Sequence, residues 1–292
     1  MHLRQKILFI INPISGGKDK EGFPLLIEKH LDKEKFLPDF VFTEYAGHAH
    51  KIASEAVAAG ADVVVAVGGD GTINEVASAL VDTSLKMGIV PCGSGNGLAL
   101  SLGLPLNSRK AIGVINQLRS MAIDTAVLNE QKFFNMAGVG FDAHISHEFA
   151  GMTSRGFRGY IKTAFSEIVK YKPGTYRIEI DGKIVERTAF MISIANSPQY
   201  GNNAYISPKA SLSDGLLDVC VVKPFPLALF PAVVLRMFTK TSDHSRYLEI
   251  IKGKNIRIVS YDNVRVHVDG EPRGAGREIS ISVNPSSLSV LY

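Results

Sequence analysis

Apolar and polar positions follow two different patterns along this chain. In the first part, short runs rich in apolar residues, at 6–11, 62–67 and 86–91, are typical of buried parallel strands. Apolar residues at helical spacing predict helices over 21–32, 47–59, 72–81 and 108–119. Because strands alternate with helices, we expect a nucleotide-binding α/β domain with a parallel sheet over residues 1–121.

After residue 121 the pattern changes to that of a mainly β-rich domain, which we expect over 122–292. Strands are predicted at 122–128, 133–137, 175–180, 187–195, 216–222, 255–260, 265–269 and 278–283. Asp181-Gly182 lies between two alternating runs, which indicates a hairpin. Helices are predicted at 157–171 and 227–239, and the second is apolar nearly all round, so we favour burial in the core over contact with a membrane.

Composition narrows the classes of protein. No apolar run approaches the ~20 residues that span a bilayer, and the amino-terminal run 7–11 is shorter than a signal-peptide core. The two cysteines are far apart in sequence and offer no disulfide framework, so we expect a reducing, cytoplasmic location. A net charge of +4 is too small to argue for nucleic acid, but it is compatible with an anionic membrane surface.

Candidate chemistry begins with the turn Gly68-Gly69-Asp70-Gly71-Thr72, which joins a predicted strand to a predicted helix. In such a turn, backbone N–H groups and a helix N-terminus converge on one point, which suits a phosphate. The aspartate within the turn suggests a magnesium ion or a hydroxyl as intermediary. Similar turns at 12–18 and 92–97 would lie at the same carboxyl edge of the sheet, so the sequence predicts a nucleotide site there.

Two familiar phosphate motifs do not apply. The stretch 12–19 resembles a P-loop, but Asn12 replaces its first glycine and Asp19 replaces the Ser/Thr that holds magnesium. The stretch 138–143 fits a relaxed dinucleotide pattern, yet no clear βαβ unit with a ribose-binding acid follows it.

Five motifs in order give a resemblance that covers nearly the whole chain. They are Asn12-Pro13-Ile14-Ser15-Gly16, Gly68-Gly69-Asp70-Gly71-Thr72 continuing as Ile73-Asn74-Glu75-Val76, 91–96, 211–218 and 268–271. Together they resemble the catalytic domain of the diacylglycerol kinase family, which includes bacterial soluble lipid kinases and eukaryotic sphingosine kinases. NAD kinases and phosphofructokinases share the second motif. The resemblance implies an α/β domain with a parallel sheet like that of NAD kinases and phosphofructokinases, followed by a β-rich, sandwich-like domain. It also implies that the active site lies in the cleft between the domains.

The third motif departs from the pattern of many bacterial members. Ser94 stands where they carry Thr, and Asn96-Gly97-Leu98-Ala99 replaces their Asn-Asp-Phe. This variant is closer to sphingosine and ceramide kinases, so the acceptor lipid stays open between diacylglycerol, a sphingoid base and a ceramide-type lipid.

The resemblance also implies roles for single residues. Asp70 would take the catalytic magnesium, Glu271 would be the general base, and Asp269 would be its partner. An ordinary Asp-Gly surface turn is the alternative for 269–271. The residues implied to line the ATP site are Asn12, Pro13, Ser15, Gly16, Thr43, Gly68, Gly69, Gly71, Thr72, Asn74 and Ser94.

The fourth motif resembles the family's structural magnesium loop. Ser211, Asp214 and the backbone carbonyl of Leu216 would supply oxygen ligands, which suit a hard cation. The alternative is a solvated turn before the strand at 216–222.

The expected function is that of an ATP- and Mg²⁺-dependent lipid kinase that acts on a lipid hydroxyl, diacylglycerol first, at a membrane surface. Two alternatives stay open. One is a kinase of a soluble substrate such as NAD, and the other is a catalytically silent lipid- or nucleotide-binding module. We expect no nucleic-acid partner, and a homodimer is left open.

Overall fold

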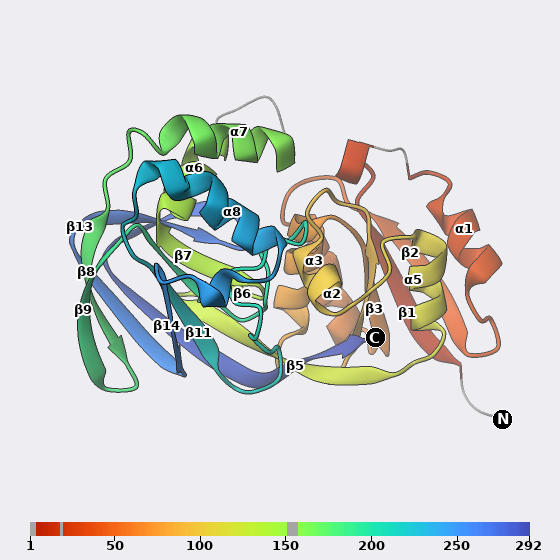
Figure 1. Ribbon diagram of the computed structural model, residues 1–292. Coiled ribbons are helices and arrows are strands. Elements are labelled where there is room, and N and C mark those ends of the chain that lie inside the picture. Colours follow the sequence, from red (N-terminus) through yellow and green to blue (C-terminus); the bar gives the residue numbers. More distant parts are fainter. Residues whose placement is uncertain (1–3, 18–19, 151–156) are drawn as a thin grey trace. The chain divides into compact units, whose positions relative to one another are not determined.

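The computed structural model describes residues 4–17, 20–150 and 157–292 and divides into two units (Figure 1). Unit 1 comprises Met1–Ile123 and Ser286–Tyr292, and unit 2 comprises Asp124–Pro285. The sequence places one boundary after residue 121, two residues from this division. The predicted second domain differs from unit 2 at its end, because the last seven residues of the chain are grouped with unit 1.

Unit 1 is an α/β unit around a parallel sheet. Its strands are β1 (Gln5–Ile11), β2 (Phe36–Phe42), β3 (Val63–Gly68), β4 (Lys86–Pro91) and the end of β14 (Glu271–Leu291), in the order β2-β1-β3-β4-β14. Its helices are α1 (Phe23–His30), α2 (His48–Ala58), α3 (Asp70–Leu80), α4 (Gly97–Ser101) and α5 (Ser108–Ile115). Every residue of β3 is buried, as its β-branched run predicts.

The end of β14 joins this sheet because Ser289 and Val290 pair in parallel with Lys86 and Met87 of β4. Leu291 contributes to the same core cluster as Phe9 of β1. This end of β14 therefore belongs to unit 1 by its hydrogen bonds and its packing, although it is far from the other strands in sequence.

Unit 2 is built mainly from antiparallel strands. They are β5 (Ser120–Leu128, which begins in unit 1), β6 (Gln131–Phe133), β7 (Met136–Gly140), β8 (Gly174–Ile180), β9 (Lys183–Ala189), β10 (Met191–Ala195), β11 (Leu217–Val222), β12 (Leu248–Gly253), β13 (Asn255–Val268) and most of β14. Its helices are α6 (Phe141–Ala150), α7 (Phe157–Glu167) and α8 (Phe230–Phe238). One path through the sheet runs β12-β11-β10-β7-β13-β14, and β8 also pairs with β13.

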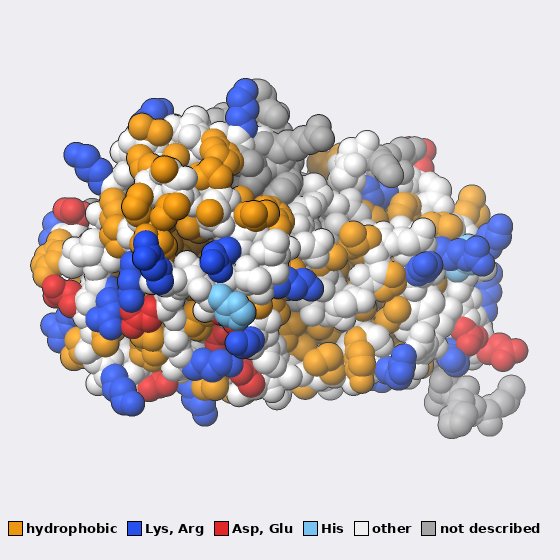
Figure 2. All heavy atoms as spheres, viewed as in Figure 1, with side chains coloured by type: hydrophobic (Ala, Val, Ile, Leu, Met, Phe, Trp, Pro, Cys, Tyr) orange, Lys and Arg blue, Asp and Glu red, His pale blue; other side chains and the backbone are white. Residues whose placement is uncertain are grey.

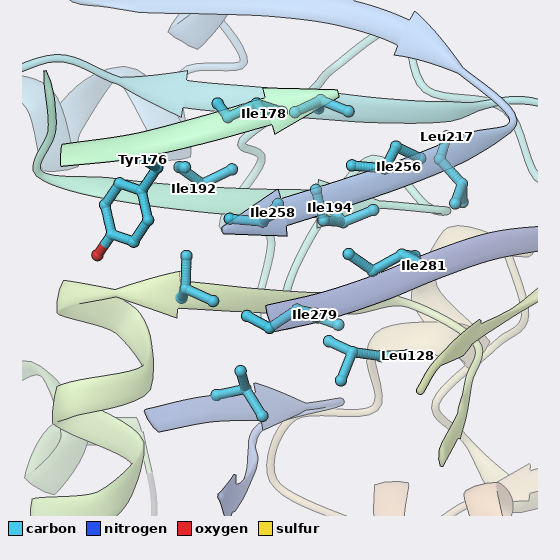
Figure 3. Close-up of a cluster of buried hydrophobic side chains, with 14 of the residues drawn as sticks. Leu128, Tyr176, Ile178, Ile192, Ile194, Leu217, Ile256, Ile258, Ile279 and Ile281 are labelled. Carbon is cyan, nitrogen blue, oxygen red and sulfur yellow. The ribbon is translucent and has the colours of Figure 1, made fainter. Parts of the chain in front are cut away.

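The core of unit 2 consists of apolar side chains from many of these strands. Tyr176, Ile192, Leu217, Ile258 and Ile279 are among those buried together, with at most 3% of each residue exposed (Figure 3). Burial of such side chains contributes about 1.5–3 kcal/mol each. The expected fold class, an α/β domain followed by a β-rich domain, is confirmed.

Several predicted elements of unit 2 need correction. The sequence pattern predicts two strands, at 255–260 and 265–269. In the structure β13 runs through both ranges as one strand, with a register shift near Val264. The sequence pattern also predicts neither β12 nor α6. The predicted strand at 187–195 is instead the end of β9 followed by β10.

The predicted helix at 227–239 is a 3₁₀ turn, Leu227–Leu229, followed by α8. The expectation of core burial is wrong for its outer side: Phe230 is buried, while Leu235 and Phe238 are 61% and 38% exposed. None of the helices in the described parts of the chain has the length and apolar character that crossing a membrane requires.

Candidate active site

The three glycine turns of unit 1 meet at the carboxyl edge of its sheet. A Cβ on Gly93 would lie 2.6 Å from the Cα of Gly69, so these two turns touch backbone to backbone. Gly16, with φ of 65°, approaches the carbonyl of Cys92 so closely that a Cβ would lie 2.0 Å from its oxygen. Only glycine permits this packing, and the turns gather as the sequence predicts.

Side chains of the first two turns brace each other. Asn12 Nδ2 donates to Thr72 Oγ1 at 2.9 Å, and Asn12 Oδ1 accepts from the N–H of Ile14 at 3.1 Å. Ser15 Oγ donates to the carbonyl of Asn12 at 3.3 Å. The structure therefore gives Asn12 and Thr72 a role in shaping the loops, and direct contact with ATP stays a prediction for both.

Asp70 connects the second turn to the third. Its Oδ2 accepts from the N–H of Asn96 at 2.8 Å and its Oδ1 from the N–H of Gly97 at 2.6 Å. The carboxylate thus satisfies free N–H groups at the start of α4, where a negative charge is favourable. Each oxygen keeps a second lone pair, so the residue fits a role in holding magnesium as well.

Asn96 holds the third turn in shape. It adopts φ of 50°, and its side chain both accepts from the N–H of Gly93 at 2.9 Å and donates to the carbonyl of Gly93 at 2.8 Å. The residue closes its own loop, so this part of the motif serves local geometry.

The remaining predicted residues of unit 1 differ in accessibility. Gly16, Gly71 and Ser94 are exposed, whereas Gly68 and Thr43 are buried; Thr43 follows β2 directly. The residues of intermediate exposure are Pro13, Ser15, Gly69, Asp70 and Asn74. The loop edge therefore presents exposed residues beside the N-terminus of α3, an arrangement whose backbone N–H groups suit an anion.

Lys20 is a further residue at this edge that sequence reasoning missed. It is only 1% exposed, and its ammonium donates to the carbonyl of Ser15. A buried lysine brings positive charge next to the first loop. No pattern in the sequence predicts it, because lysine is usually exposed.

In unit 2, Asp269 and Gly270 form the two-residue hairpin turn between β13 and β14, with φ of 48° and 85°. The carboxylate of Asp269 accepts the N–H groups of Phe134, Asn135 and Met136 at 2.8–2.9 Å. Burial raises the pKa of Asp269, although these backbone donors act in the opposite direction. Asp269 thus anchors the segment 134–136.

Glu271 differs from Asp269 in being exposed. Its Oε2 accepts from Arg273 Nη2 at 2.8 Å, and more than two fifths of each side chain is in contact with solvent. Among the predicted pair of acids, Glu271 is therefore the one whose carboxylate can reach a substrate, while Asp269 fixes the turn that carries it.

A buried polar network adjoins this turn. His267 Nε2 lies 3.0 Å from Asp142 Oδ2, which also accepts from Ser193 Oγ at 2.9 Å and Tyr200 OH at 3.1 Å. The N–H of Gly270 lies 3.4 Å from His267 Nδ1, so the network reaches the Asp269–Glu271 turn. The sequence places His267 on the same face of the strand as Asp269, but nothing in it reveals Asp142 as the partner.

Glycine at position 138 leaves room for this network, which lies directly over it. A Cβ at that position would be 2.6 Å from Asp142 Oδ2 and 3.0 Å from His267 Nε2. The glycine of the relaxed dinucleotide pattern thus has a packing role, which agrees with the rejection of a dinucleotide site.

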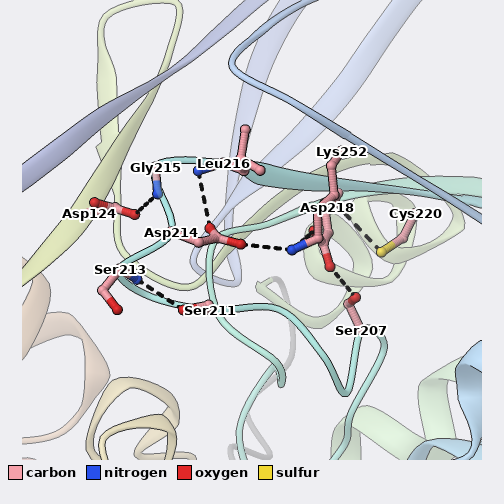
Figure 4. Close-up of polar contacts among 10 residues, drawn as sticks. All are labelled: Asp124, Ser207, Ser211, Ser213, Asp214, Gly215, Leu216, Asp218, Cys220 and Lys252. Atoms are coloured by element: carbon pink, nitrogen blue, oxygen red, sulfur yellow. Dashed lines mark hydrogen bonds and ion pairs between the residues drawn. The ribbon is translucent and has the colours of Figure 1, made fainter.

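The predicted metal loop contains both oxygen groups and a competing cation (Figure 4). Ser211 Oγ accepts from the N–H of Ser213 at 3.3 Å, and Asp214 Oδ1 accepts from the N–H of Leu216 at 3.1 Å. Lys252 Nζ lies 2.7 Å from Asp214 Oδ2, and this hydrogen bond raises the pKa of Lys252.

Two further carboxylates stand beside the loop. Asp124 Oδ2 accepts from the N–H of Gly215 at 2.6 Å, and Asp218 Oδ1 lies 3.5 Å from Lys252 Nζ. Within the described ranges, no three His, Cys, Asp or Glu side chains are grouped so as to hold a metal ion. The donors of the loop suit magnesium in kind, but Lys252 already balances the charge of Asp214.

Two family models match this chain. Residues 6–128 match the diacylglycerol kinase catalytic domain, and residues 135–292 match the YegS C-terminal NAD kinase β-sandwich-like domain. The chain is 28% identical over 280 residues to a diacylglycerol kinase of Staphylococcus aureus MRSA252, which covers 93% of this chain and 88% of the relative. It is also 28% identical over 273 residues to the diacylglycerol kinase of Bacillus subtilis 168, which covers 91% and 89%.

Solved structures agree on the fold. A putative diacylglycerol kinase from Bacillus anthracis Sterne matches with a TM-score of 0.80 and 24% identity, over 99% of this chain and 97% of that one. An NAD kinase from Archaeoglobus fulgidus in complex with ATP matches with a TM-score of 0.56 and 13% identity, over 98% and 93%. With both family models in chain order, the protein belongs to the diacylglycerol kinase family and is a phosphotransferase that acts on an alcohol group.

Proposed function

We propose that this protein is an ATP- and magnesium-dependent lipid kinase that transfers the γ-phosphoryl group of ATP to a lipid hydroxyl, with diacylglycerol as the first candidate. The assembly of three glycine turns at the N-terminus of α3 carries the proposal, since it concentrates backbone donors for phosphate. The names of the Staphylococcus and Bacillus relatives support diacylglycerol as acceptor. The ATP complex of the NAD kinase supports ATP as donor.

Phosphoryl transfer requires alignment and neutralisation of charge more than covalent help from the protein. The backbone N–H groups of the exposed residues Gly16, Gly71 and Ser94 would bind the phosphates, and the buried Lys20 would add to the positive potential. Asp70 would hold the magnesium ion that accompanies ATP, and the ion would supply further charge neutralisation.

Glu271 accepts the proton of the lipid hydroxyl as that oxygen attacks the γ-phosphorus. An exposed carboxylate is accessible to an acceptor, and Arg273 orients it through the 2.8 Å hydrogen bond. Asp269 and the network that includes His267 hold the backbone of the turn, so they position the base without touching substrate.

The experiment is a kinase assay with radiolabelled ATP and four acceptors in parallel. Diacylglycerol, sphingosine and ceramide are dispersed in detergent, and NAD is supplied in solution. We expect phosphorylation of a lipid, diacylglycerol first, and its loss in Glu271→Gln. Phosphorylation of NAD alone would favour the second candidate, which the likeness to the NAD kinase fold supports. If ATP binds but no acceptor is phosphorylated, the proposal of a lipid kinase fails.

A further inference from the structure

Unit 2 exposes large apolar side chains on two neighbouring helical segments. Figure 2 shows hydrophobic side chains gathered over α7 and α8. Their exposed fractions run from 36% for Leu229 to 73% for Val169. We call this the α7–α8 surface, and it consists of Phe165, Val169, Leu227, Leu229, Leu235 and Phe238.

The inner side of α8 is firmly packed, so its orientation is well defined. Phe230 is 7% exposed, and its ring centroid lies 5.0 Å from that of Phe165 on α7. Val234 packs on the core cluster that contains Phe190. Leu235 points away from this packed side and is 61% exposed, and Phe238, the last residue of α8, is 38% exposed. The apolar outer side therefore results from the fold itself.

The charges beside this surface are mainly positive. Arg236, Lys240 and Arg246 are exposed. Two carboxylates occur in 157–172 and 223–246, and both are paired: Glu167 lies 2.8 Å from Lys170, and Asp243 lies 2.8 Å from Lys209. An apolar surface bordered by basic side chains, with no free carboxylate in these two described ranges, complements a lipid leaflet, whose interior is apolar and whose headgroups are anionic.

We propose that the α7–α8 surface docks on an anionic membrane. This inference rests on the proposed function, because it supplies the contact through which a lipid kinase reaches an acceptor in a bilayer. The apolar side chains enter the headgroup region, while Arg236, Lys240 and Arg246 bind lipid phosphates and carboxylates. A second copy of the chain fits less well, because a two-fold interface would bring the same basic side chains of both copies together.

The experiment measures binding to sedimented vesicles in the absence of ATP. Vesicles of phosphatidylcholine are compared with vesicles that also contain phosphatidylserine, at low and high salt. We expect binding to the anionic vesicles that weakens with salt, and a loss of at least ~10-fold in the double variant Leu235→Glu/Phe238→Glu, since burial of two large apolar side chains is lost. Replacing Arg236 with Gln should weaken binding about five-fold.

Leu25→Glu is the matched control, since Leu25 is 74% exposed on α1 of unit 1 and lies outside the proposed surface. We expect it to bind vesicles as the parent does. Equal binding by the parent and the double variant would overturn the proposal. So would a parent dimer in gel filtration that becomes a monomer in the double variant, because a second copy would then be the occupant.

Kinase activity separates this inference from the proposed function. A water-soluble short-chain diacylglycerol should be phosphorylated equally by the parent and the double variant, while the vesicle-borne lipid is phosphorylated by the parent alone. If the parent phosphorylates no lipid but binds vesicles, and the double variant does not bind them, then the proposed function is wrong and the proposed docking surface is supported. Equal phosphorylation of the vesicle-borne lipid by both proteins contradicts the surface and leaves the function intact.

Discussion

Two Asp-Gly turns of unit 2 have nearly the same backbone and very different surroundings. Asp181-Gly182 joins β8 to β9 with φ of 48° and 82°, and Asp269-Gly270 joins β13 to β14 with φ of 48° and 85°. Both carboxylates accept backbone N–H groups from another segment. Asp181 accepts those of Lys254 and Asn255 at 2.9–3.2 Å, and Asp269 accepts those of 134–136.

The difference lies in burial and in the residue that follows. Asp181 is exposed, and its backbone donors lower its pKa, whereas burial raises the pKa of Asp269. Lys183 follows the first turn and Glu271 the second. An Asp-Gly turn is therefore a structural feature by itself, and a candidate site arises where a half-buried aspartate holds an exposed carboxylate in place.

The largest expected effect is that of Glu271→Gln. The amide keeps the size of the side chain but cannot accept a proton as a carboxylate does, so kcat should fall ~100- to 10,000-fold. Nucleotide affinity should stay within a few-fold of the parent, because the base acts in the transition state. Calorimetry of ATP binding beside turnover on the lipid checks both, and turnover close to that of the parent would exclude Glu271 as the base.

Unit 1 contains a further Asp-Gly pair, Asp70-Gly71, whose carboxylate also accepts backbone N–H groups. Asp70→Asn should lower kcat by at least ~100-fold, the scale on which charge stabilisation of phosphoryl transfer acts. The amide retains one oxygen for the two N–H groups of Asn96 and Gly97, so we also expect a loss of stability of about 1–2 kcal/mol. Circular dichroism and thermal unfolding would show an intact fold. A parent-like kcat at saturating ATP and magnesium would remove Asp70 from the chemistry.

Asp269→Asn and Asp181→Asn test the comparison directly. Asparagine offers one acceptor to the three N–H groups around Asp269, so that variant should lose about 1–3 kcal/mol of stability, and Asp181→Asn should lose less. The pKa of Asp181 is lowered in the fold, so its contribution to stability is present above its unfolded pKa and is lost as the pH falls. The pKa of Asp269 is raised, so its contribution is largest at low pH and is lost as the pH rises.

Urea unfolding of both variants at several pH values measures these signs. For Asp181→Asn the loss of stability relative to the parent should shrink in acid, and for Asp269→Asn it should grow. The same pH trend in both variants would mean that burial does not distinguish the two turns.

The sequence predicts the elements of unit 1 better than those of unit 2 for a physical reason. The runs at β3 and β4 are almost entirely buried, and short turns connect them through α3, so local patterns carry the information. The return of β14 to pair with β4 depends on contacts about 200 residues away in sequence, which no local pattern encodes. The outward face of α8 was missed because an all-round apolar helix is usually buried.

Local sequence patterns also do not encode the contacts within the candidate site. The motifs name the glycine turns, which the structure brings together, and Glu271, whose role as base stays a prediction. They do not reveal that Asp70, Asn96 and Asp269 are bound to backbone N–H groups. Lys252 was also missed as the partner of Asp214, because it lies on β12, a strand that the sequence pattern did not predict.

The fourth Asp-Gly pair, Asp214-Gly215, gives the smallest expected effect. Magnesium and the ammonium of Lys252 would compete for one carboxylate, so Lys252→Met should show a larger magnesium-dependent rise in Tm than the parent. An ion at ten times its Kd contributes about 1.4 kcal/mol, which is a few degrees for a chain of this size. Asp214→Ala should show no such rise. Scanning calorimetry with and without magnesium compares the three proteins. An equal rise in the parent and Lys252→Met would show that the ammonium does not compete, and an equal rise in Asp214→Ala would place the ion outside this loop.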